Sequence, residues 1–452
     1  MFLYPIIPQI YALIIKPPHF FPSLPAIPCY NIHMNSLSAI KEAPIQPEQL
    51  EFNFEGYDEE PLSEKSFATA ETLTLNAITG ASTFTDLFED ARCISRIYDN
   101  DEEYRGLYYI FRAHDAVTGR NIAIKATNPL LYEAERKLED CLKWESKVLQ
   151  ILKGKHRMQQ ILTPCKTMQT NIQLEGKNYI VPVSFFSSIY MDIDVRKSFF
   201  DEANDRVKTC TNRLKLFCSM ISAVQSLHRE GFCHRDLKPS NVMGMRKDGR
   251  CTAVLIDLGL SLATAEIERE IKLFSPNAED LPMMYCAPEL YSGFEDNFEL
   301  AKSADIYALG CMLFELLDKR SFYTTLQETN GSTFWEAANN IRVGKEEFNG
   351  SENKRLALFN ELLSEFAPSI IIPRISEDSI IPGYVRNELQ KIISSMCAFD
   401  YRKRAKENNL DGIKEKLRLI IRILENEHLR EFYKKRREIH RAKKSARGDS
   451  NA

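Results

Sequence analysis

The most constraining feature of this chain is the polar segment 234–241, which reads His-Arg-Asp-Leu-Lys-Pro-Ser-Asn and follows a predicted helix over 214–229. Sixteen residues after its asparagine, beyond an apolar run at 253–256, stands Asp-Leu-Gly at 257–259, and Ala-Pro-Glu occupies 287–289. A single polar cluster of this kind is typical of a solvated turn. Three such motifs in a fixed order, separated by apolar segments, indicate chemistry instead.

Together these motifs resemble the signature set of the eukaryotic-type protein kinase family, in its Ser/Thr-specific form. Further matches follow in family order. Lys125, which ends an Ile-Ala-Ile-Lys run, resembles the ATP-binding lysine, and Glu145, twenty residues on, resembles its helical partner. Asp305 lies in an apolar helix pattern, as in the family. Arg404 resembles the arginine that pairs with the Ala-Pro-Glu glutamate, here Glu289.

The resemblance covers residues 95–408 and implies an α+β, protein-kinase-like bilobed fold. A small β-rich N-lobe with one long helix is expected at 95–194, and a larger, mainly helical C-lobe at 195–408. At roughly 100–200 residues per domain, the length of 452 residues alone suggests two to four units. The motifs narrow this to one catalytic unit, with an insertion expected around 321–374 because the interval between the last two matched motifs is long.

The hydrophobic pattern predicts where the elements of the two lobes lie. Alternating apolar residues predict strands, and apolar residues at three- and four-residue steps predict helices with one buried face. The predicted strands span 107–113, 121–126, 178–186 and 188–193. The predicted helices lie within 130–152, 214–229, 306–317 and 389–396.

The resemblance implies a role for each matched residue in phosphoryl transfer from ATP, where catalysis is mainly positioning and charge neutralisation. Lys125 is expected to hold the α- and β-phosphates, and its ion pair with Glu145 to fix its geometry. Asn241 and Asp257 supply hard oxygen ligands, which suit Mg²⁺. Solvated lysines and turn-capping aspartates are the ordinary alternative, but that alternative would have to hold at all the matched positions together.

The loop at 234–241 is expected to act on the protein substrate. Asp236 would accept the hydrogen bond of the attacking hydroxyl, and Lys238 would neutralise charge on the transferred group. Lys238 followed by Pro-Ser-Asn resembles the sequence of this loop in Ser/Thr-specific kinases, so serine and threonine hydroxyls are the expected phosphate acceptors.

Residue-by-residue matching also suggests where adenine would bind. Met191 falls at the gatekeeper position, and the hinge at 192–195, beginning with Asp192 and Ile193, would hydrogen-bond adenine through its backbone. Met243, two residues after the loop asparagine, would lie beneath the adenine ring. Apolar residues at such positions are also ordinary core residues.

Two segments depart from the family pattern. The segment aligned with the glycine-rich loop, 103–110, has Gly106 as its only glycine, and the three expected glycine positions hold Glu103, Arg105 and Tyr108. Side chains there restrict the approach of backbone to phosphate, so ATP is expected to bind weakly or the loop to lie differently. Pro282 stands where many Ser/Thr kinases have a threonine, and it supplies neither a hydroxyl nor an N–H group.

The retained motif residues make an active Ser/Thr protein kinase the leading hypothesis. The departures motivate the alternative, a kinase-like scaffold (pseudokinase) that binds partners with weak or no phosphoryl transfer. A small-molecule kinase of similar fold is disfavoured by Arg235, by the Lys-Pro pair at 238–239 and by the Ala-Pro-Glu motif. Arg235 is further expected to pair with a phosphate on the activation segment, where the candidate acceptors are Ser261, Thr264 and Ser275.

The first 94 residues are expected to form a Pro-rich, then acidic, disordered leader. Residues 1–33 carry seven prolines and a single charged side chain, Lys16. Either translation starts at Met34, or this segment contacts an interface or a partner. Nine acids against one base over 42–71 predict flexible chain.

The C-terminal segment 409–452 is expected to be a basic helical tail. Residues 434–447 hold eight bases against one acid. Such a concentration of positive charge suits acidic protein partners, RNA, anionic lipid, a nuclear-import receptor or the chain's own acidic leader, and it equally suits a simply solvated tail.

The overall composition limits the remaining possibilities. With 59 Lys and Arg against 63 Asp and Glu, the formal charge is −4 and no global field marks the chain as a nucleic-acid binder. Eleven cysteines without a Cys-x-x-Cys pair suit a reducing compartment, so a cytoplasmic protein is expected, with nuclear or membrane-surface association left open. No apolar run reaches the roughly 18 residues of a membrane span.

Overall fold

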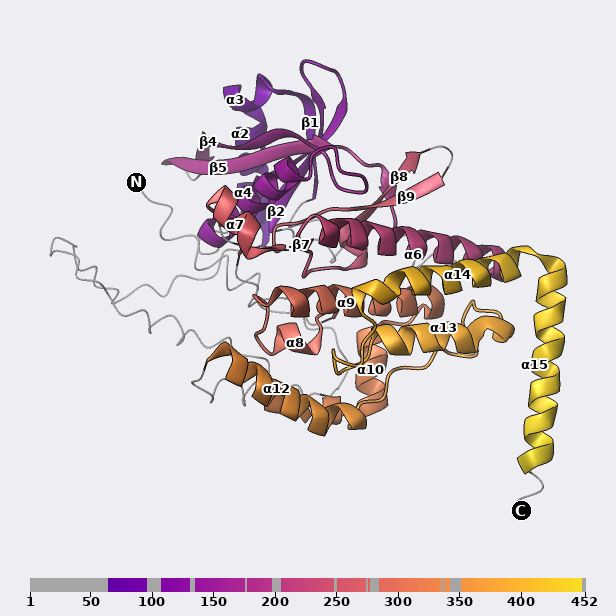
Figure 1. Cartoon of the computed structure of the whole chain (residues 1–452). Coiled ribbons are helices and arrows are strands. Elements are labelled where there is room, and N and C mark those ends of the chain that lie inside the picture. The colour runs from indigo at the N-terminus through magenta and orange to yellow at the C-terminus, as the bar shows by residue number, and fades with distance from the viewer. Residues whose placement is uncertain are drawn as a thin grey trace.

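A computed structural model describes the chain in eleven stretches. They are 64–95, 107–130, 135–174, 177–196, 205–247, 250–273, 275–276, 284–334, 336–337, 339–341 and 351–448. The described residues form a β-rich N-lobe above a larger helical C-lobe (Figure 1). This confirms the expected α+β bilobed fold. Residues 1–63, including the Pro-rich segment and Met34, lie outside the described residues.

The N-lobe is built on one five-stranded antiparallel sheet in the order β1-β2-β3-β5-β4. Its strands are β1 (Phe88–Ser95), β2 (Tyr108–Asp115), β3 (Asn121–Thr127), β4 (Ile161–Leu174) and β5 (Lys177–Ile189). Alternate residues of β2 and β3, such as Phe111 and Ile124, are fully buried on one face. The other face carries Lys125, because successive side chains of a strand point to opposite faces.

The two faces of this sheet have different helical cover. Helix α4 (Glu135–Ile151) packs on the face that carries Lys125 and brings Leu142, Val148 and Leu149 into the main core. The opposite face is covered by α2 (Glu64–Gly80) and α3 (Ser82–Thr85). The predicted leader is therefore wrong for residues 64–94, which form two helices and the first strand.

The strand prediction is also corrected at two places. A single strand, β5, replaces the two strands predicted at 178–186 and 188–193. The sequence reading missed β4, whose register with β5 shifts around Thr163 and whose buried residues alternate with polar ones. The long β4–β5 hairpin extends past the rest of the sheet, where α2 packs against β4 (Figure 1).

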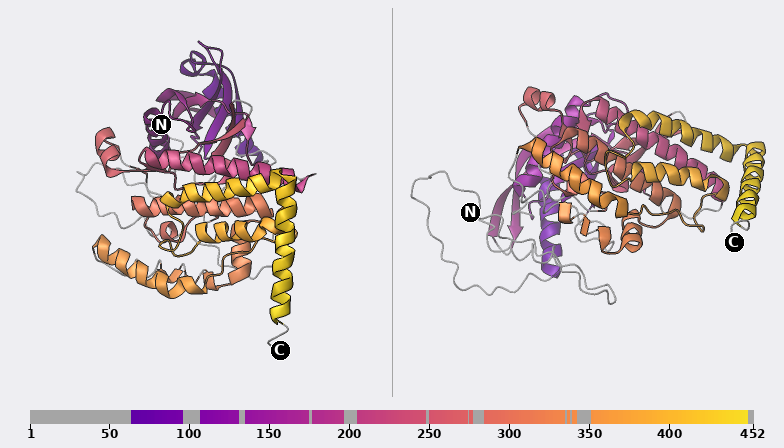
Figure 2. Two further views of the ribbon diagram at one scale, coloured as in Figure 1. Left: turned by 45° about the vertical axis from the view of Figure 1, so that its right-hand side comes forward. Right: turned by 60° about the horizontal axis from the view of Figure 1, so that its bottom comes forward.

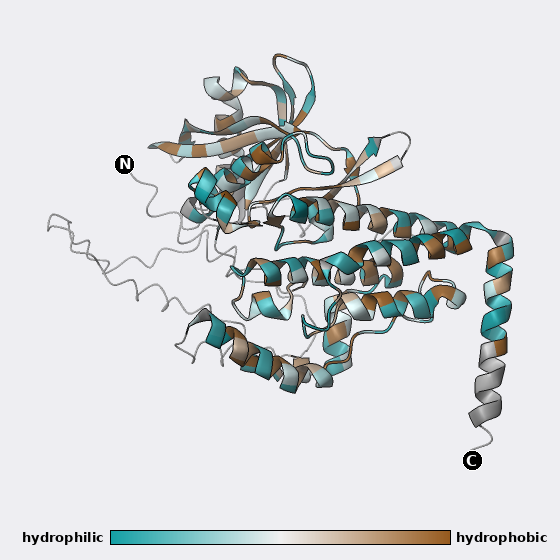
Figure 3. Ribbon diagram, viewed as in Figure 1, coloured by the Kyte–Doolittle hydropathy of each residue, from teal (hydrophilic) through white to brown (hydrophobic). Residues whose placement is uncertain are grey.

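The C-lobe is organised around α9 (Phe298–Asp318), which is buried along nearly its whole length. A helix that is hydrophobic on all sides belongs in the middle of a core. Around it pack α6 (Arg206–Arg229), α8 (Pro288–Tyr291), α10 (Phe322–Asn330) and α13 (Gly383–Met396). Asp205 and Asn297 cap the N-termini of α6 and α9 by accepting backbone N–H groups. Figure 3 shows the alternation of hydrophobic and hydrophilic residues that results along the surrounding helices.

Short strands and turns carry the polar motifs between the lobes. The strands are β6 (Ile193–Asp194), β7 (Phe232–Cys233), β8 (Val242–Lys247), β9 (Arg250–Leu255) and β10 (Leu262–Ala263). Further helical elements are the 3-10 turns Pro239–Asn241, Ala367–Ser369 and Glu407–Asn409 and the helices α7 (Ala265–Ile271) and α12 (Glu352–Phe366). Helices α10 and α12 lie within the segment predicted as an insertion, which packs at the lower side of the C-lobe (Figure 1).

The predicted basic tail divides into two unlike helices. In α14 (Leu410–Glu425), Leu417, Ile421 and Leu424 are buried and the helix packs on α6. Residues 410–425 therefore belong to the C-lobe core, which corrects the expected boundary at 409. Helix α15 (Glu427–Gly448) then turns away and runs along the edge of the C-lobe (Figure 2). Among the described residues, no helix has the length and apolar character needed to cross a membrane.

Candidate active site

Three charged side chains from distant parts of the sequence meet beneath the sheet. The Lys125 ammonium on β3 donates to Glu145 Oε2 of α4 and to Asp257 Oδ1, both at 2.6 Å. Glu145 is 1% exposed, and its other oxygen accepts the backbone N–H of Leu258 at 3.1 Å. One cation thus joins the sheet, the long helix and the Asp-Leu-Gly motif, as the sequence predicts for Lys125 and Glu145.

The charged groups of this cluster shift one another's pKa. Burial acts to lower the pKa of Lys125, but the carboxylates of Asp257 and Glu145 more than offset it and raise that pKa. Desolvation acts to raise the pKa of Asp257, but the adjacent ammonium holds it below the ordinary value. Lys125 and Asp257 therefore both remain ionised at neutral pH.

The loop at 234–241 brings its polar groups together. Lys238 Nζ donates to Asp236 Oδ2 at 2.8 Å, and Asn241 Nδ2 donates to the same oxygen at 3.0 Å. Asn241 also donates to the Asp236 carbonyl at 2.8 Å, which closes the loop on itself. Burial raises the pKa of the Asp236 carboxyl, and the Lys238 charge partly opposes this. Asp236 is thus a carboxylate with raised proton affinity.

Asp305 of α9 supports this loop from below. Its two oxygens accept the backbone N–H groups of His234 and Arg235 at 2.8 and 2.9 Å. Its Oδ2 also lies 2.8 Å from Nε2 of His228. Arg235 has a φ of 64°, an unfavourable value for a residue with a side chain, so the buried carboxylate offsets local strain.

Arg235 is held by backbone carbonyl groups and by one carboxylate, since its Nη1 also lies 3.7 Å from Asp296 Oδ1. Its buried guanidinium donates to the carbonyl oxygens of Leu260, Pro276 and Glu295 at 2.6, 2.6 and 3.2 Å. Two of these carbonyl groups, those of Leu260 and Pro276, lie in the segment between Asp-Leu-Gly and Ala-Pro-Glu, and that of Glu295 lies beyond it. The pairing of Arg235 with a phosphate stays a prediction.

The three candidate phosphoacceptors differ in their surroundings. Ser261 is fully buried, and its hydroxyl accepts from Trp144 Nε1 and donates to the Leu258 carbonyl. Ser275 donates to Glu268 at 2.5 Å and accepts from a backbone N–H. Thr264 is partly exposed at the start of α7.

The hinge region connects β5 to the C-lobe through β6. Ile193 pairs with Gly244 of β8 and Asp194 with Met243, while the binding of adenine at 192–195 stays a prediction. Gly244 is required there, because a Cβ atom would lie 2.7 Å from the Ile193 side chain. Asp192 is exposed and Met191 partly exposed, and both follow the end of β5.

Strand register identifies a residue that the sequence reading missed. Phe186 of β5, which is 1% exposed, lies opposite Lys125. Met191, predicted as gatekeeper, lies after the last residue of that strand. The assignment of Met191 to that role stays a prediction, whereas Phe186 is the β5 residue opposite Lys125, with Ile110 of β2 on the other side.

The two departures from the family pattern lie largely outside the described residues. The connection from β1 to β2 spans 96–107, of which only Leu107 is described, and Pro282 lies in the undescribed stretch 277–283. Tyr108 is described: it opens β2, and Lys125 Nζ stands 4.3 Å from the centre of its ring.

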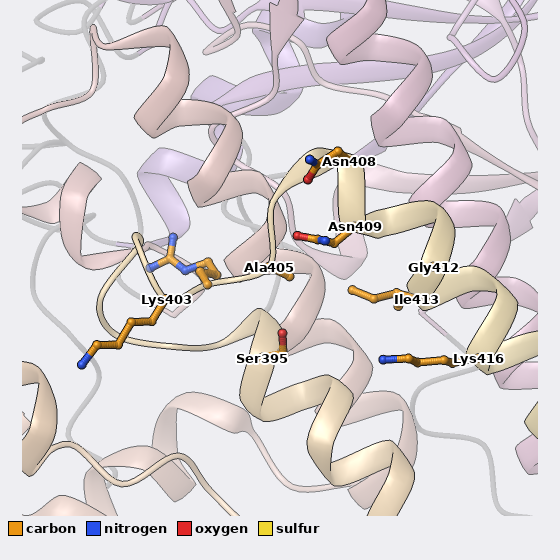
Figure 4. Close-up of a pocket in the computed structure, with 9 residues that line it drawn as sticks. Ser395, Lys403, Ala405, Asn408, Asn409, Gly412, Ile413 and Lys416 are labelled. Carbon is orange, nitrogen blue, oxygen red and sulfur yellow. The ribbon is translucent and has the colours of Figure 1, made fainter.

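A second buried ion pair fastens the base of the C-lobe. Arg404 forms a bidentate pair with Glu289 of the Ala-Pro-Glu motif, and both side chains are fully buried. Beside it, between α13 and α14, lies a hollow of about 380 Å³ lined by Ser395, Lys403, Arg404, Ala405, Asn408, Asn409, Gly412, Ile413 and Lys416 (Figure 4). Arg404 is the one lining residue that the motifs single out, so this hollow is separate from the residues expected to carry chemistry.

A bilobed fold with a lysine–glutamate pair, a polar loop and an Asp-Leu-Gly turn at the junction of the lobes defines the class of phosphotransferases to which protein kinases belong. Residues 109–412 match the protein kinase domain family. The chain therefore belongs to that family, as its motifs predict.

Several curated relatives share part of this match. Cyclin-dependent kinase B2-2 of Arabidopsis thaliana is 26% identical over 216 residues, covering 47% of this chain and 62% of the relative. Human activin receptor type-1B is 33% identical over 129 residues, covering 26% and 25%. Serine/threonine-protein kinase PknH of Mycobacterium tuberculosis is 36% identical over 102 residues, covering 23% and 14%. The chain spans less than two thirds of the length of each of these relatives.

Proposed function

We propose that this chain is a Ser/Thr protein kinase that transfers the γ-phosphate of ATP to serine or threonine hydroxyls of protein substrates, with Mg²⁺ as its metal. The observation that supports it most strongly is that the Lys125–Glu145–Asp257 cluster and the loop holding Asp236 and Asn241 are assembled together. The name of the Mycobacterium relative, a serine/threonine-protein kinase, supports the choice of acceptor.

The oxygen atoms available at the site suit a hard cation. Asn241 uses its side-chain nitrogen on Asp236, so its carbonyl oxygen is the atom it would offer to Mg²⁺. Asp257 pairs with Lys125 through one oxygen, and its side chain remains 42% exposed. When bound, Mg²⁺ would neutralise charge on the phosphates of ATP.

Individual residues of the chain would then bind and orient the reacting groups. Lys125, fixed by Glu145, presents a cation to the nucleotide phosphates. Asp236 accepts the hydrogen bond of the substrate hydroxyl, and its raised pKa suits it to receive the proton as the new P–O bond forms. Lys238, 2.8 Å from Asp236, places a positive charge beside the transferred group.

Phosphate transfer to a generic protein substrate in Mg-ATP tests the proposal. Asp236→Asn and Asp257→Ala should each lower kcat/KM by at least about 100-fold, because each removes a group acting on the reacting atoms. Asp378→Asn, at an exposed aspartate of the C-lobe, is the matched control and should leave the rate unchanged. Transfer that survives both site substitutions would reject the assignment.

A kinase-like scaffold is the second candidate, favoured by the scarcity of glycine at 103–110. It predicts that ATP, with or without Mg²⁺, leaves the melting temperature unchanged. A Mg²⁺-dependent rise in melting temperature together with measurable transfer would exclude it.

The proposed setting is a reducing compartment such as the cytoplasm. Apart from Cys93, the cysteines that the structure describes are free thiols, which supports this setting. We also propose that α15 contacts an acidic partner through its exposed Lys434, Lys435 and Arg436. Co-sedimentation with anionic vesicles, RNA and acidic peptides, comparing the full chain with a triple Glu variant of these positions, would identify the partner class or reject the contact.

A further inference from the structure

Tyr108 connects three parts of the N-lobe. It is the first residue of β2 and pairs with Thr127 of β3. Its ring lies beneath the Lys125 ammonium, with Nζ 4.3 Å from the ring centre. Its hydroxyl donates to the carbonyl oxygen of Leu138, in the first turns of α4, at 2.9 Å. The side chain therefore reaches from the sheet, past Lys125, to the long helix.

The surroundings of Lys125 leave little room for another partner. An ammonium group has three N–H donors, and two of them point to Glu145 and Asp257 at 2.6 Å. The face of the Tyr108 ring covers the ammonium from a further side. The Lys125 side chain is only 12% exposed as a result. A phosphate oxygen needs a hydrogen bond from this same ammonium, so it competes with the ring for the same place.

The sequence position of Tyr108 makes this cover unusual. It stands at the third expected glycine position of the loop aligned with 103–110, where a glycine would have no side chain to place beside the lysine. The arrangement is therefore a property of this chain rather than a consequence of the fold.

We propose that Tyr108 is a gate of the nucleotide site, closed when its ring covers the Lys125 ammonium and its hydroxyl is tied to α4. This inference rests on the proposed ATP-dependent function. Opening requires the loss of one cation–π contact and one neutral hydrogen bond, both of modest strength, so nucleotide can displace the ring. The apparent affinity is then reduced by the fraction of molecules in which the gate is open.

Truncation of the ring tests the gate directly. Isothermal titration of the full chain with Mg-ADP should show that Tyr108→Ala binds about 10-fold more tightly than the parent, because contacts of this strength no longer hold the closed state. Tyr108→Phe keeps the ring and removes the tether to α4, so it should bind more tightly by a smaller factor, about 3-fold.

Tyr401 offers a matched control in the C-lobe. Lys406 Nζ lies 5.3 Å from the centre of its ring, and its hydroxyl donates to Asn360 at 2.9 Å. Tyr401→Phe should leave nucleotide affinity unchanged. Melting curves without nucleotide verify that each variant is folded. If Tyr108→Ala is unfolded, the affinity of Tyr108→Phe decides the test.

The possible results separate the gate from the proposed function. Weaker binding by Tyr108→Ala would mean that the ring positions Lys125 for nucleotide, and equal binding would mean that it does not obstruct the site; either result overturns the gate alone. If the parent and every variant fail to bind Mg-ADP, the gate and the nucleotide-dependent function are both overturned.

Discussion

Arg404 and Glu289 form a bidentate ion pair in which both side chains are fully buried, joining the Ala-Pro-Glu motif to the segment before α14. Arg404 also donates to the carbonyl oxygens of Ser303 and Ala398, both at 3.0 Å. One guanidinium thus fixes three segments of the C-lobe around a single buried carboxylate.

Removing one partner of this pair should be strongly destabilising. Arg404→Met leaves the Glu289 carboxylate buried without its counter-ion, so the free energy of unfolding should fall by about 3–5 kcal/mol in urea denaturation. Glu388→Gln, which removes the exposed carboxylate of the Lys391–Glu388 pair, is the control and should change stability little. Equal effects of the two substitutions would show that burial of the pair has no special consequence.

Helix α3, on the face of the sheet opposite Lys125, should contribute to the stability of the N-lobe. The Phe84 ring lies 5.0, 5.5 and 5.6 Å from the rings of Phe88, Phe111 and Phe185. Phe84→Ala should lower the free energy of unfolding by about 3–5 kcal/mol, because a buried aromatic ring is replaced by a cavity. Thermal unfolding measures this loss, and Ile180→Ala, at a 69% exposed position on β5, should be nearly neutral. A neutral Phe84→Ala would mean that α3 is dispensable.

The residues of the kinase-family motifs were predictable from the sequence because the proposed chemistry allows few residue types at each of these positions. Lys125 and Asp257 are 132 positions apart, yet each has a recognisable neighbourhood, and the structure joins them at 2.6 Å. Their contact geometry follows from the fold once the family resemblance is known.

Helix α2, which covers one face of the sheet, could not be predicted from the amino-acid composition. Acids dominate the sequence up to Glu71, which predicts disorder, but Ala70, Leu75 and Ile78 supply a buried stripe against the sheet. Strand β4 was missed for a related reason, since its buried Met168, Thr170 and Ile172 alternate with polar residues on the exposed face.

The contact of Tyr108 could not be predicted from the sequence. It depends on how α4 approaches β2, which places the Leu138 carbonyl within hydrogen-bond distance of the hydroxyl. Tertiary packing, rather than local pattern, decides such contacts.

Ser261 should remain unmodified, although it lies in the activation segment. Its hydroxyl is buried and bonded to both Trp144 and the Leu258 carbonyl, so no kinase can reach it in the folded protein. Mass spectrometry after incubation with Mg-ATP should find no phosphate there. Ser261→Ala should lower the free energy of unfolding by about 1–3 kcal/mol, because the buried Trp144 N–H loses its acceptor. Stoichiometric phosphate on Ser261 would contradict this assignment.

The acid limb of the pH–rate profile should report the Asp236 carboxyl. Burial raises its pKa above the ordinary value of 3.8, while Lys238 acts to lower it. In the proposed reaction the carboxylate form accepts the substrate proton, so kcat/KM should fall as the pH drops through this raised pKa. Lys238→Ala removes the opposing charge and should move the acid limb to higher pH, besides lowering the plateau. Asp378→Asn should leave the limb in place, and a limb that stays unmoved in Lys238→Ala would show that another group controls it.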